Sequence, residues 1–556
     1  MACKCNEEES FIPNAKLNYQ MLQTLTDISD EELRALAEKS VKKLDNIAAD
    51  KDTMLRVFGV KDSNREKNHF QKCVGIYNEL LCQEYSKETL KQIKKSLVND
   101  YRAGKIDVDG KYLFIIPDLY AFCEHLFLGI EVPQGLLKDG EVSARMFAKR
   151  EKLDCLRSPH LYREHGVRRN VVNEDTKKWF RTDALYTSSY DLISKLLQFD
   201  CDGDKSLVVA DELFVSIAER NMHGIVPLYY EMAKAGQMHI DNMKIYDGLQ
   251  AAYSGGNIGE ISNTITKIWN SGEMTQDKLD VIKWLCFENN VVIDYAKTLW
   301  AVQRPPHADA AIKAFAKMKP PQFFIYAKDK TQEQVEPRND SIVNKLFDII
   351  PDKRMRFTAA NLGKFDYKVL MRNPIVSIDP RVIEKFKDLD ARKNLSLSYG
   401  SNEENYAFFR TTVRCELYAI NPNVNAVCDM LVAHFFRDKK SKSLNTFWLC
   451  YGDIVFQNIR NNIEKDYIQC SCCGKRFWRT SYKNQICEAC IEKMSNPNLP
   501  KPVRYKVKVC IDCGKEFKTV STARRACRCT ECSKIRKRKN TAKRVSLFRS
   551  KESNAL

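Results

Sequence analysis

The sequence lacks an apolar run long enough to cross a bilayer, and it lacks an apolar stretch at its beginning. A membrane-spanning helix needs about 20 consecutive apolar residues. The most apolar region, residues 112–132, is interrupted by Pro117, Asp118, Glu124 and His125. Residues 1–6 hold no apolar segment of the kind found in secretion signals. We therefore expect no contact with a membrane and no export.

Disulfide bonds are not expected either, although the sequence holds 21 cysteines. Without an export signal the thiols should stay reduced, and they are then available to bind metal ions. The chain has 556 residues, of which 44% are hydrophobic. By length alone this corresponds to roughly three or four domains, each with its own core.

Net charge is small over most of the chain. The formal charge is +18, but residues 501–556 alone hold 18 Lys and Arg against 4 Asp and Glu, which leaves +4 for the first 500 residues. Positive charge that is concentrated in a tail is typical of proteins that contact phosphate backbones. The tail therefore predicts a nucleic-acid partner.

One short acidic loop, residues 199–204, carries the strongest chemical signal. Asp200, Asp202 and Asp204 alternate along it, and Gly203 permits the sharp turn that lets alternating side chains converge. Three converging carboxylates require a cation. Hard oxygen ligands without a neighbouring pair of Cys or His favour Mg²⁺, which keeps positions for water or phosphate. The loop therefore predicts a magnesium site that handles phosphate groups.

Three alternatives for this loop remain open from the residues alone. An EF-hand needs Gly at its sixth position and Glu at its twelfth, where this chain has Lys205 and Asp211. A strand followed by Asp-x-Asp-Gly resembles haloacid-dehalogenase-type phosphatases, with Asp200 as nucleophile and Asp202 as acid and base. That family has Thr or Val in place of Asp204. The third alternative is a solvated acidic turn between strands.

Residues 156–165 form a second polar segment. Two arginines and two histidines, Arg157, His160, Arg163 and His165, flank a turn fixed by Pro159. In a chain that also has the acidic loop, this density of cationic groups predicts contact with phosphates. Lys297 lies further along the chain and is interpreted either as a nucleic-acid contact or as half of a solvated ion pair.

The order of these segments resembles that in the second double-psi β-barrel of the RNA-dependent RNA polymerases of RNA silencing. Gly140-Glu141-Val142, Arg157-Ser158-Pro159 and the loop Asp200–Asp204 carry the resemblance. The same order resembles the large catalytic subunit of cellular RNA polymerases and the single-chain RNA polymerases of bacteriophages. Residues 257–263 and 293–298 resemble the helical region behind the barrel in the silencing enzymes, so the resemblance spans 105–300.

The resemblance implies an RNA polymerase, a nucleotidyltransferase that adds NTPs to an RNA 3′-hydroxyl on a nucleic-acid template. Asp200, Asp202 and Asp204 would hold the catalytic Mg²⁺, which activates that hydroxyl, while a second ion stabilises the leaving pyrophosphate. Arg157, Arg163 and Lys297 would bind the substrate. The resemblance also implies phage or prophage transcription in the cytoplasm of a bacterial host cell.

The chain departs from these families in its N-terminal part. The polymerases have another double-psi barrel before the Asp-bearing one, and it supplies lysines to the triphosphate. Here residues 14–107 have helical spacing, with a capping box at Ser29 and Glu32. The hypothesis is a split polymerase, in which a second chain carries the lysine-bearing barrel and this chain alone is inactive.

The C-terminal part contains two zinc-ribbon patterns. Each consists of two Cys-x₂-Cys pairs, and the first pair of each is followed by Gly-Lys-x-Phe. Four thiolates at this spacing make a tetrahedral Zn²⁺ site, which a module this small needs in order to fold. Cys472 and Cys527 lie close enough in sequence to replace a ligand. The predicted zinc ligands are Cys470, Cys473, Cys487 and Cys490 in the first ribbon, and Cys510, Cys513, Cys529 and Cys532 in the second.

Together these features predict an α+β protein with a double-psi β-barrel core embedded in helical domains. The alternatives to a polymerase are a non-catalytic nucleic-acid-binding zinc protein and a Mg²⁺-dependent phosphatase. The expected domains are a helical region (1–103), the barrel (104–215), a helical region behind it (216–321), a mixed α/β domain of unknown role (322–465), the first zinc ribbon (466–495) and the second ribbon with the basic tail (505–556).

Overall fold

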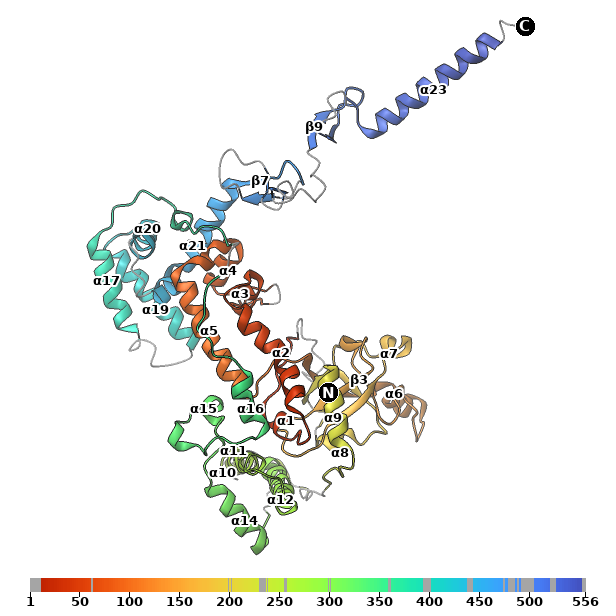
Figure 1. Cartoon of the computed structure of the whole chain (residues 1–556), viewed down its shortest axis with the longest axis vertical. Helices are drawn as coiled ribbons and strands as arrows, with labels where there is room; N and C mark the ends of the chain where they lie inside the picture. The colour runs from red at the N-terminus through yellow and green to blue at the C-terminus, as the bar shows by residue number, and fades with distance from the viewer. Residues whose placement is uncertain are drawn as a thin grey trace. The chain divides into compact units, whose positions relative to one another are not determined.

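The computed structural model divides the chain into two compact units. Unit 1 comprises Met1–Arg65 and Ser86–Leu362, and unit 2 comprises Glu66–Tyr85 and Gly363–Leu556. The elements are labelled in Figure 1. The structure describes residues 12–552, except for 62–63, 199, 202, 230–236, 238, 255–257, 299, 301, 359–361, 394–401, 438–443, 474–475, 479–485, 488–489, 492–504 and 521–526.

The N-terminal part is helical, as predicted. The capping box at α2 forms, because Ser29 N–H donates to Glu32 Oε2 (2.9 Å) and Glu32 N–H donates to Ser29 Oγ (3.1 Å). The helices of unit 1 in this part are α1 Tyr19–Gln23, α2 Asp30–Asn46 and α3 Lys51–Val57, and α5 Glu84–Arg102 begins at the boundary between the units.

Six strands follow and close into a barrel, which confirms the predicted architecture. The strand order around the barrel is β1-β5-β2-β4-β3-β6. The pairs β1–β5 and β2–β4 are parallel, and the other four are antiparallel. The strands are β1 Gly110–Pro117, β2 Glu141–Ser143, β3 Lys152–Leu156, β4 Gly166–Asn170, β5 Leu185–Thr187 and β6 Lys205–Val209.

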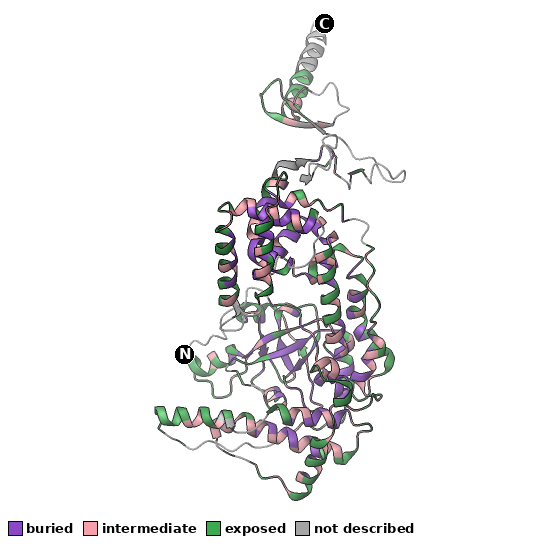
Figure 2. Ribbon diagram, turned by 90° about the vertical axis from the view of Figure 1, so that its left-hand side faces the viewer, coloured by how far each residue is buried: buried purple, intermediate pink, exposed green. Residues whose placement is uncertain are grey.

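Strands β2, β3, β5 and β6 are buried on both faces apart from the first residues of β3 and β6, and the strand period of two decides which core each residue joins. In β6, Val208 points into the barrel core, while Leu207 and Val209 belong to an outer core. Figure 2 shows most of the barrel strands as buried. Strand β2 is short and ends at Ser143, and residues 145–147 then form a 3₁₀ turn, η3.

Helices cover the barrel, and one apolar core joins α1, α2, α5, α9 and α16 to its outer face. A separate core holds α11, α12 and α14 against Leu161 and Tyr162. Short helices interrupt the barrel strands: α6 Leu119–Leu128, α7 Glu174–Trp179 and α8 Ile193–Leu197. The later helices of unit 1 are α9 Glu212–Met222, α10 Asn242–Ser254, α11 Ile258–Trp269, α12 Gln276–Ile293, α13 Tyr295–Thr298, α14 Pro306–Lys317, α15 Phe324–Ala327, η4 Gln332–Gln334 and α16 Ile342–Ile349.

Unit 2 corrects two sequence-based expectations. Residues 66–85 were expected with the N-terminal helices, but Phe70 packs edge-on against Trp448, with ring centroids 4.8 Å apart. Residues 322–465 were predicted to mix strands and helices, yet the described residues of that range contain helices only. The helices of unit 2 before the cysteine clusters are α4 His69–Ile76, η2 Asn78–Cys82, η5 Tyr367–Leu370, α17 Pro380–Ala391, α19 Asn402–Tyr418, α20 Val424–Val432, the π-helical turn η6 Ala433–Arg437 and α21 Leu444–Asp466.

The described part of residues 322–465 forms helices without strands because of the spacing of its apolar residues. In α21, Phe447, Tyr451, Val455 and Ile459 recur every four residues, and all four are buried. This is the spacing of one helix face, whereas a half-buried strand alternates every two residues.

Two antiparallel hairpins and a long helix follow α21. The hairpins are β7 Tyr467–Gln469 with β8 Arg476–Trp478, and β9 Tyr505–Val509 with β10 Glu516–Val520. The last helix is α23, Thr530–Glu552. Among the described residues, no helix is both long and apolar enough to cross a membrane.

Candidate active site and cysteine clusters

The acidic loop lies on the barrel between α8 and β6. The N–H of Asp200 donates to Oδ2 of Asp204 (3.1 Å), so the two ends of the loop are in contact. The carbonyl of Asp204 accepts from the N–H of Ile115 (3.0 Å), one step beyond the β1–β6 ladder. Asp200 and Asp204 are exposed, whereas Asp202 lies outside the described residues. The barrel thus presents the loop to solvent and fixes its C-terminal end.

The local sequence explains the turn. Gly203 has φ = +131°, a conformation that favours glycine, and a Cβ atom there would meet no other atom within 4 Å. Among the described residues, the space next to Gly203 is therefore open. Gln198 ends α8 in the left-handed region at φ = +52°, which turns the chain away from the helix and into the loop.

Three side chains from distant parts of the sequence form a clamp at the base of the loop. Arg157 Nη1 donates to Gln198 Oε1 and to Asn290 Oδ1, both at 3.0 Å. Asn290 Nδ2 in turn donates to Gln198 Oε1. We call Arg157, Gln198 and Asn290 the loop clamp. It joins the segment after β3, the end of α8 and helix α12, so it holds in place the residue that leads into the acidic loop.

Arg157 was predicted from the sequence, but its two amide partners were not. The signal for Asn290 is a polar residue within a helix whose neighbours Val291 and Val292 are apolar. That signal alone does not reveal a partner 133 positions away. A sequence pattern shows the spacing within one element, whereas the clamp depends on how three elements pack.

The two histidines of the segment 156–165 do not face phosphates, which corrects the prediction. His160 and His165 are buried, with ring centroids 4.9 Å apart. His165 Nδ1 lies 2.7 Å from Asp154 Oδ2, and His160 Nε2 lies 3.1 Å from Thr24 Oγ1. Burial and the neighbouring His165 lower the pKa of His160 well below its usual value, so this ring is neutral. These histidines belong to the interior beneath the barrel.

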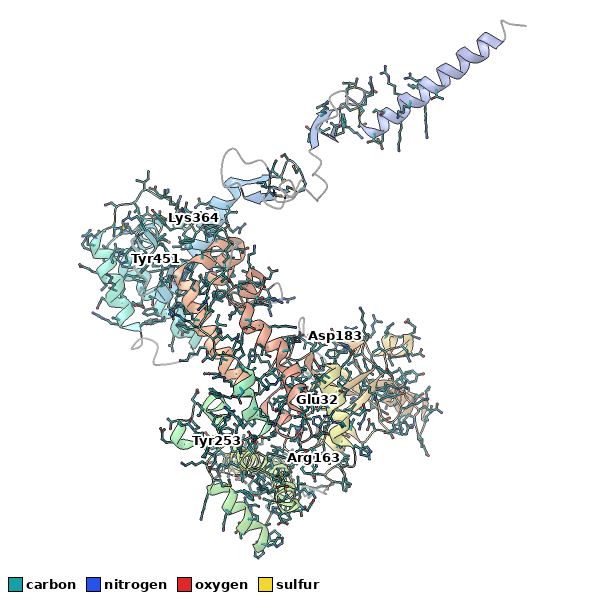
Figure 3. All side chains as sticks on the ribbon, viewed as in Figure 1. Glu32, Arg163, Asp183, Tyr253, Lys364 and Tyr451 are labelled. Atoms are coloured by element: carbon teal, nitrogen blue, oxygen red, sulfur yellow. The ribbon has the colours of Figure 1, made fainter. Side chains whose placement is uncertain are left out.

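Arg163, labelled in Figure 3, is partly buried, and its Nη2 donates to Thr26 Oγ1 (3.1 Å). Arg163 therefore contacts the segment that follows α1, whereas the loop clamp is formed by Arg157, Gln198 and Asn290. Lys297 falls within α13, but its side chain lies outside what the structure describes. Of the predicted substrate-binding residues whose side chains the structure describes, Arg157 contacts Gln198, the residue just before the acidic loop, and Arg163 contacts Thr26.

A small cavity of about 40 Å³ adjoins the loop clamp and is lined by Arg157, Gln198, Asn290 and Glu164, among others. Burial raises the pKa of Glu164 to about 7, although the carboxylate accepts a hydrogen bond from the N–H of Leu228 (2.9 Å). The site therefore contains a titratable acid close to neutral pH next to the clamp.

The eight predicted zinc ligands come together as two groups of four. In each group all four sulfur atoms lie within 4.8 Å of one another. A tetrahedral ion with Zn–S bonds of about 2.3 Å needs sulfur atoms about 3.8 Å apart. The Cys473–Cys487 and Cys513–Cys529 sulfur distances are 3.6 Å and 3.8 Å. The residues therefore fit a zinc ion in both groups.

The first cluster has a core made largely of sulfur, comprising Cys470, Cys472, Cys487, Cys490 and Ile486. The N–H groups of Cys472 and Cys487 donate to Cys470 Sγ at 3.4 and 3.2 Å, which stabilises a thiolate. Cys472 lies outside the four-sulfur group, as does Cys527 in the second module. Cys472 and Cys527, which lie close enough in sequence to replace a ligand, are thus not among the four sulfur atoms of either group.

A closed six-stranded barrel that presents an acidic loop, together with two Cys₄ clusters, is the architecture that the resemblance to double-psi RNA polymerases implies. The chain is 48% identical over 495 residues to the DNA-directed RNA polymerase YonO of Bacillus phage SPbeta. The resemblance to RNA polymerases is thereby confirmed. No family model matches the chain.

The match covers 89% of this chain and 58% of the phage polymerase, so the chain spans little more than half the length of that relative. A solved structure, RNA dependent RNA polymerase QDE-1 from Thielavia terrestris, is similar with a TM-score of 0.41 and 14% identity. That likeness covers 82% of this chain and 57% of the other. It is too distant to support an argument about function.

The structure also weighs against the alternatives for the acidic loop. An EF-hand loop that starts at Asp200 would run to Asp211, but residues 205–209 of that stretch form strand β6 of the barrel. A haloacid-dehalogenase-type loop is preceded by a strand, whereas helix α8 precedes the loop here. The loop does not connect two strands either, although Asp200 and Asp204 are exposed, as they would be in a solvated turn.

Proposed function

We propose that this chain carries the Asp-bearing half of a phage RNA polymerase, which adds NTPs to an RNA 3′-hydroxyl on a nucleic-acid template. The observation that supports this most is the 48% identity to a DNA-directed RNA polymerase. The acidic loop on the barrel supplies the chemistry. Because the chain matches 58% of the relative's length, the activity is assigned to an assembly that includes the remaining part.

In this proposal Asp200, Asp202 and Asp204 hold Mg²⁺. The donors fit, since Asp200 and Asp204 offer exposed oxygen ligands on a loop whose turn at Gly203 leaves open space. When bound, Mg²⁺ lowers the pKa of the attacking hydroxyl and offsets charge on the triphosphate. The contact between Asp200 N–H and Asp204 Oδ2 keeps the loop turned for that role.

Arg157 has two parts in this proposal. Through Nη1 it fixes Gln198 and hence the start of the loop, and as a permanent cation it compensates phosphate charge beside the metal. Arg163 and Lys297 are proposed as further contacts to the nucleotide or the RNA. Zn²⁺ is proposed for the two cysteine clusters, which hold structure rather than take part in the reaction.

We also propose a partner, either a second chain or a further part of the same polymerase, that provides the lysine-bearing barrel. An exposed apolar surface on this barrel supports it. Helix α6 buries only Ala121, whereas Phe127 and Leu128 are 74% and 71% exposed. Contiguous apolar surface of this kind marks an interaction site. We call the exposed side chains of α6 and the following loop the α6 surface: Leu119, Phe122, Leu126, Phe127, Leu128, Ile130 and Val132.

The occupant proposed for the α6 surface is the part of the phage polymerase that has no counterpart in this chain. That part amounts to about two-fifths of the relative, which is large enough to cover a helix of ten residues. A variant with Phe122, Phe127 and Leu128 changed to Ser should lose this association. The barrel should stay folded, because the three side chains are already exposed.

The proposal is tested by primer extension with NTPs and Mg²⁺ on single-stranded DNA and RNA templates. The chain is assayed alone and together with the remaining part of the SPbeta polymerase, in each case beside Asp202→Ala. We expect templated RNA only in the presence of the added part, and none with the variant. Robust synthesis by the chain alone would contradict the split arrangement and retain the polymerase.

No synthesis under any condition, by a folded chain that still binds nucleic acid, would contradict the polymerase. The cysteine clusters and the basic C-terminal residues would then favour the second candidate, a nucleic-acid-binding zinc protein.

A further inference from the structure

Helix α23 begins at the second cysteine cluster and has basic residues on every side. Residues 530–542, whose side chains are described, are exposed apart from Cys532 and Ser533. Five of the six residues from 534 to 539 are Lys or Arg. Successive residues turn by about 100°, so these five cover the whole circumference of the helix. Residues 534–542 therefore present no continuous apolar face that could pack against another element.

Such a helix is destabilised by its own charge. Lys534 lies three and four positions before Lys537 and Arg538, and like charges at these spacings repel. Residues 530–542 of the helix contain a single acidic residue, Glu531 in the first turn. The repulsion is relieved where phosphate groups neutralise the side chains. The composition therefore suits a polyanion along the length of the helix.

The cysteine cluster anchors the start of α23. Cys529 immediately precedes the helix and Cys532 lies in its first turn, and both belong to the second four-sulfur group. The N–H of Ser533 donates to the carbonyl of Cys529 (2.9 Å), and Arg528 Nε donates to Asp512 Oδ2 (2.6 Å). The first turn is the costly step in helix formation. A metal ion bound by Cys529, just before the helix, and by Cys532, in its first turn, would remove part of that cost.

We propose that α23 is a binding site for the phosphate backbone of duplex nucleic acid, and that the metal of the second cysteine cluster holds it in helical form. A helix of this diameter fits the major groove of B-DNA. Single-strand binders stack successive bases on several aromatic side chains, whereas the sequence of α23 contains one aromatic residue, Phe548, near its C-terminal end. The site does not depend on the proposed catalysis, since binding needs neither NTPs nor Mg²⁺.

The test measures the affinity of the zinc-loaded full chain for a labelled duplex DNA at several salt concentrations. In the charge variant, Lys534, Arg536, Lys537, Arg538 and Lys539 are changed to Gln. The control variant loses the same amount of charge from exposed positions in unit 1, at Lys39, Lys42, Lys51, Lys91 and Lys95. Each lost phosphate contact lowers the slope of log K against log [salt] by about 0.9.

We expect the charge variant to reduce the slope by about 4.5 and the control variant by less than about 1. An unchanged slope in the charge variant would overturn the site. Asp204→Asn should bind like the wild type, which separates this inference from the proposed polymerase. Duplex RNA is assayed in parallel. If duplex RNA also binds, and the charge variant shows the same reduction in slope, the site is supported with RNA as the nucleic acid.

The role of the metal is tested with Cys529→Ser/Cys532→Ser, which keeps all the basic residues. We expect the double cysteine variant to bind one zinc ion fewer than the wild type. Its slope of log K against log [salt] should be reduced as much as in the charge variant. Wild-type salt dependence in this variant would overturn the coupling to metal. If the chain bound single strands more tightly than the duplex, or bound polyglutamate or anionic vesicles as tightly as the duplex, the claim that α23 binds duplex nucleic acid would be contradicted.

Discussion

The barrel and the cysteine modules are both built on short β-strands, but different forces hold them. In β6 of the barrel, Leu207, Val208 and Val209 are all fully buried. In β9 of the second module, Val507 and Val509 are 58% and 59% exposed. The barrel thus removes these apolar side chains from water, whereas β9 leaves Val507 and Val509 in contact with it.

The difference shows where each region obtains its stability. The barrel cores recruit residues from helices distant in sequence, such as Met21, Val98 and Phe214. The first cysteine module has a cluster of sulfur atoms with one isoleucine, so a metal ion bound by its four thiolates would have to replace the missing core. The site for chemistry is placed on the apolar scaffold, and the basic surface is placed on the metal-dependent one.

Metal removal should separate the two regions most strongly. With a high-affinity zinc chelator we expect the release of two ions and complete loss of structure in both cysteine modules, because modules this small need the metal to fold. The thermal transition of the barrel should not move. Zinc release is followed with a colorimetric indicator, and limited proteolysis locates the unfolded segments. Barrel unfolding in step with zinc release would contradict the comparison.

A core truncation should do the reverse. Leu207→Ala removes a fully buried side chain from β6 and should destabilise unit 1 by about 2–5 kcal/mol. The matched change Val507→Ala in β9 removes an exposed side chain and should cost less than about 0.5 kcal/mol. Thermal unfolding with zinc analysis compares the two. Equal losses of stability in the two variants would show that the hairpin has a core of its own.

The acid beside the loop clamp should give unit 1 a pH-dependent stability. The pKa of Glu164 is raised from 4.5 to about 7 by burial, so its contribution is fully present below pH 4.5 and is lost as the pH rises through about 7. The loss is at most about 3 kcal/mol. In Glu164→Gln the decline between pH 4.5 and 7.5 should be reduced. Identical profiles for the variant and the wild type would contradict the assignment.

The smallest effect concerns the loop clamp. Asn290→Ala removes a donor to Gln198 and an acceptor from Arg157, which should cost about 1–2 kcal/mol and lower RNA synthesis by the assembled polymerase. Its neighbour Asn289 is buried, and its side-chain atoms have no hydrogen-bond partner in the structure. Asn289→Ala should therefore cost less. An equal loss in the two variants would show that the amides fill space rather than hold the loop.

The sequence predicts those features whose signal is confined to a short stretch. The cysteine pairs are identified by spacing alone, since Cys-x₂-Cys fixes the geometry within a few residues. The acidic loop is identified in the same way, by alternation around Gly203. The barrel was expected from the resemblance rather than from periodicity, because strands such as Glu141–Ser143 are too short to show a pattern.

The sequence analysis missed or misassigned those residues whose position depends on how distant elements pack together. His160 and His165 look like phosphate ligands in the sequence, but folding places them inside, against Asp154 and Thr24. The clamp partners Gln198 and Asn290 are 92 residues apart, and no local pattern joins them. The apolar residues of α21 were taken as part of a mixed domain, although their spacing of four is helical.

The measurement that tests the central claim most directly compares two substitutions of the same kind on the same barrel. Asp204→Asn changes the acidic loop, and Asp175→Asn changes an exposed carboxylate in α7 outside it. Templated NTP incorporation is measured for both variants in the assembled polymerase, with thermal unfolding as a check on the fold. The account predicts a loss of at least about 1,000-fold for Asp204→Asn and wild-type synthesis for Asp175→Asn, since phosphoryl transfer rests on electrostatic stabilisation by the metal ions. Undiminished synthesis by a folded Asp204→Asn protein would contradict the claim that this loop is the catalytic centre.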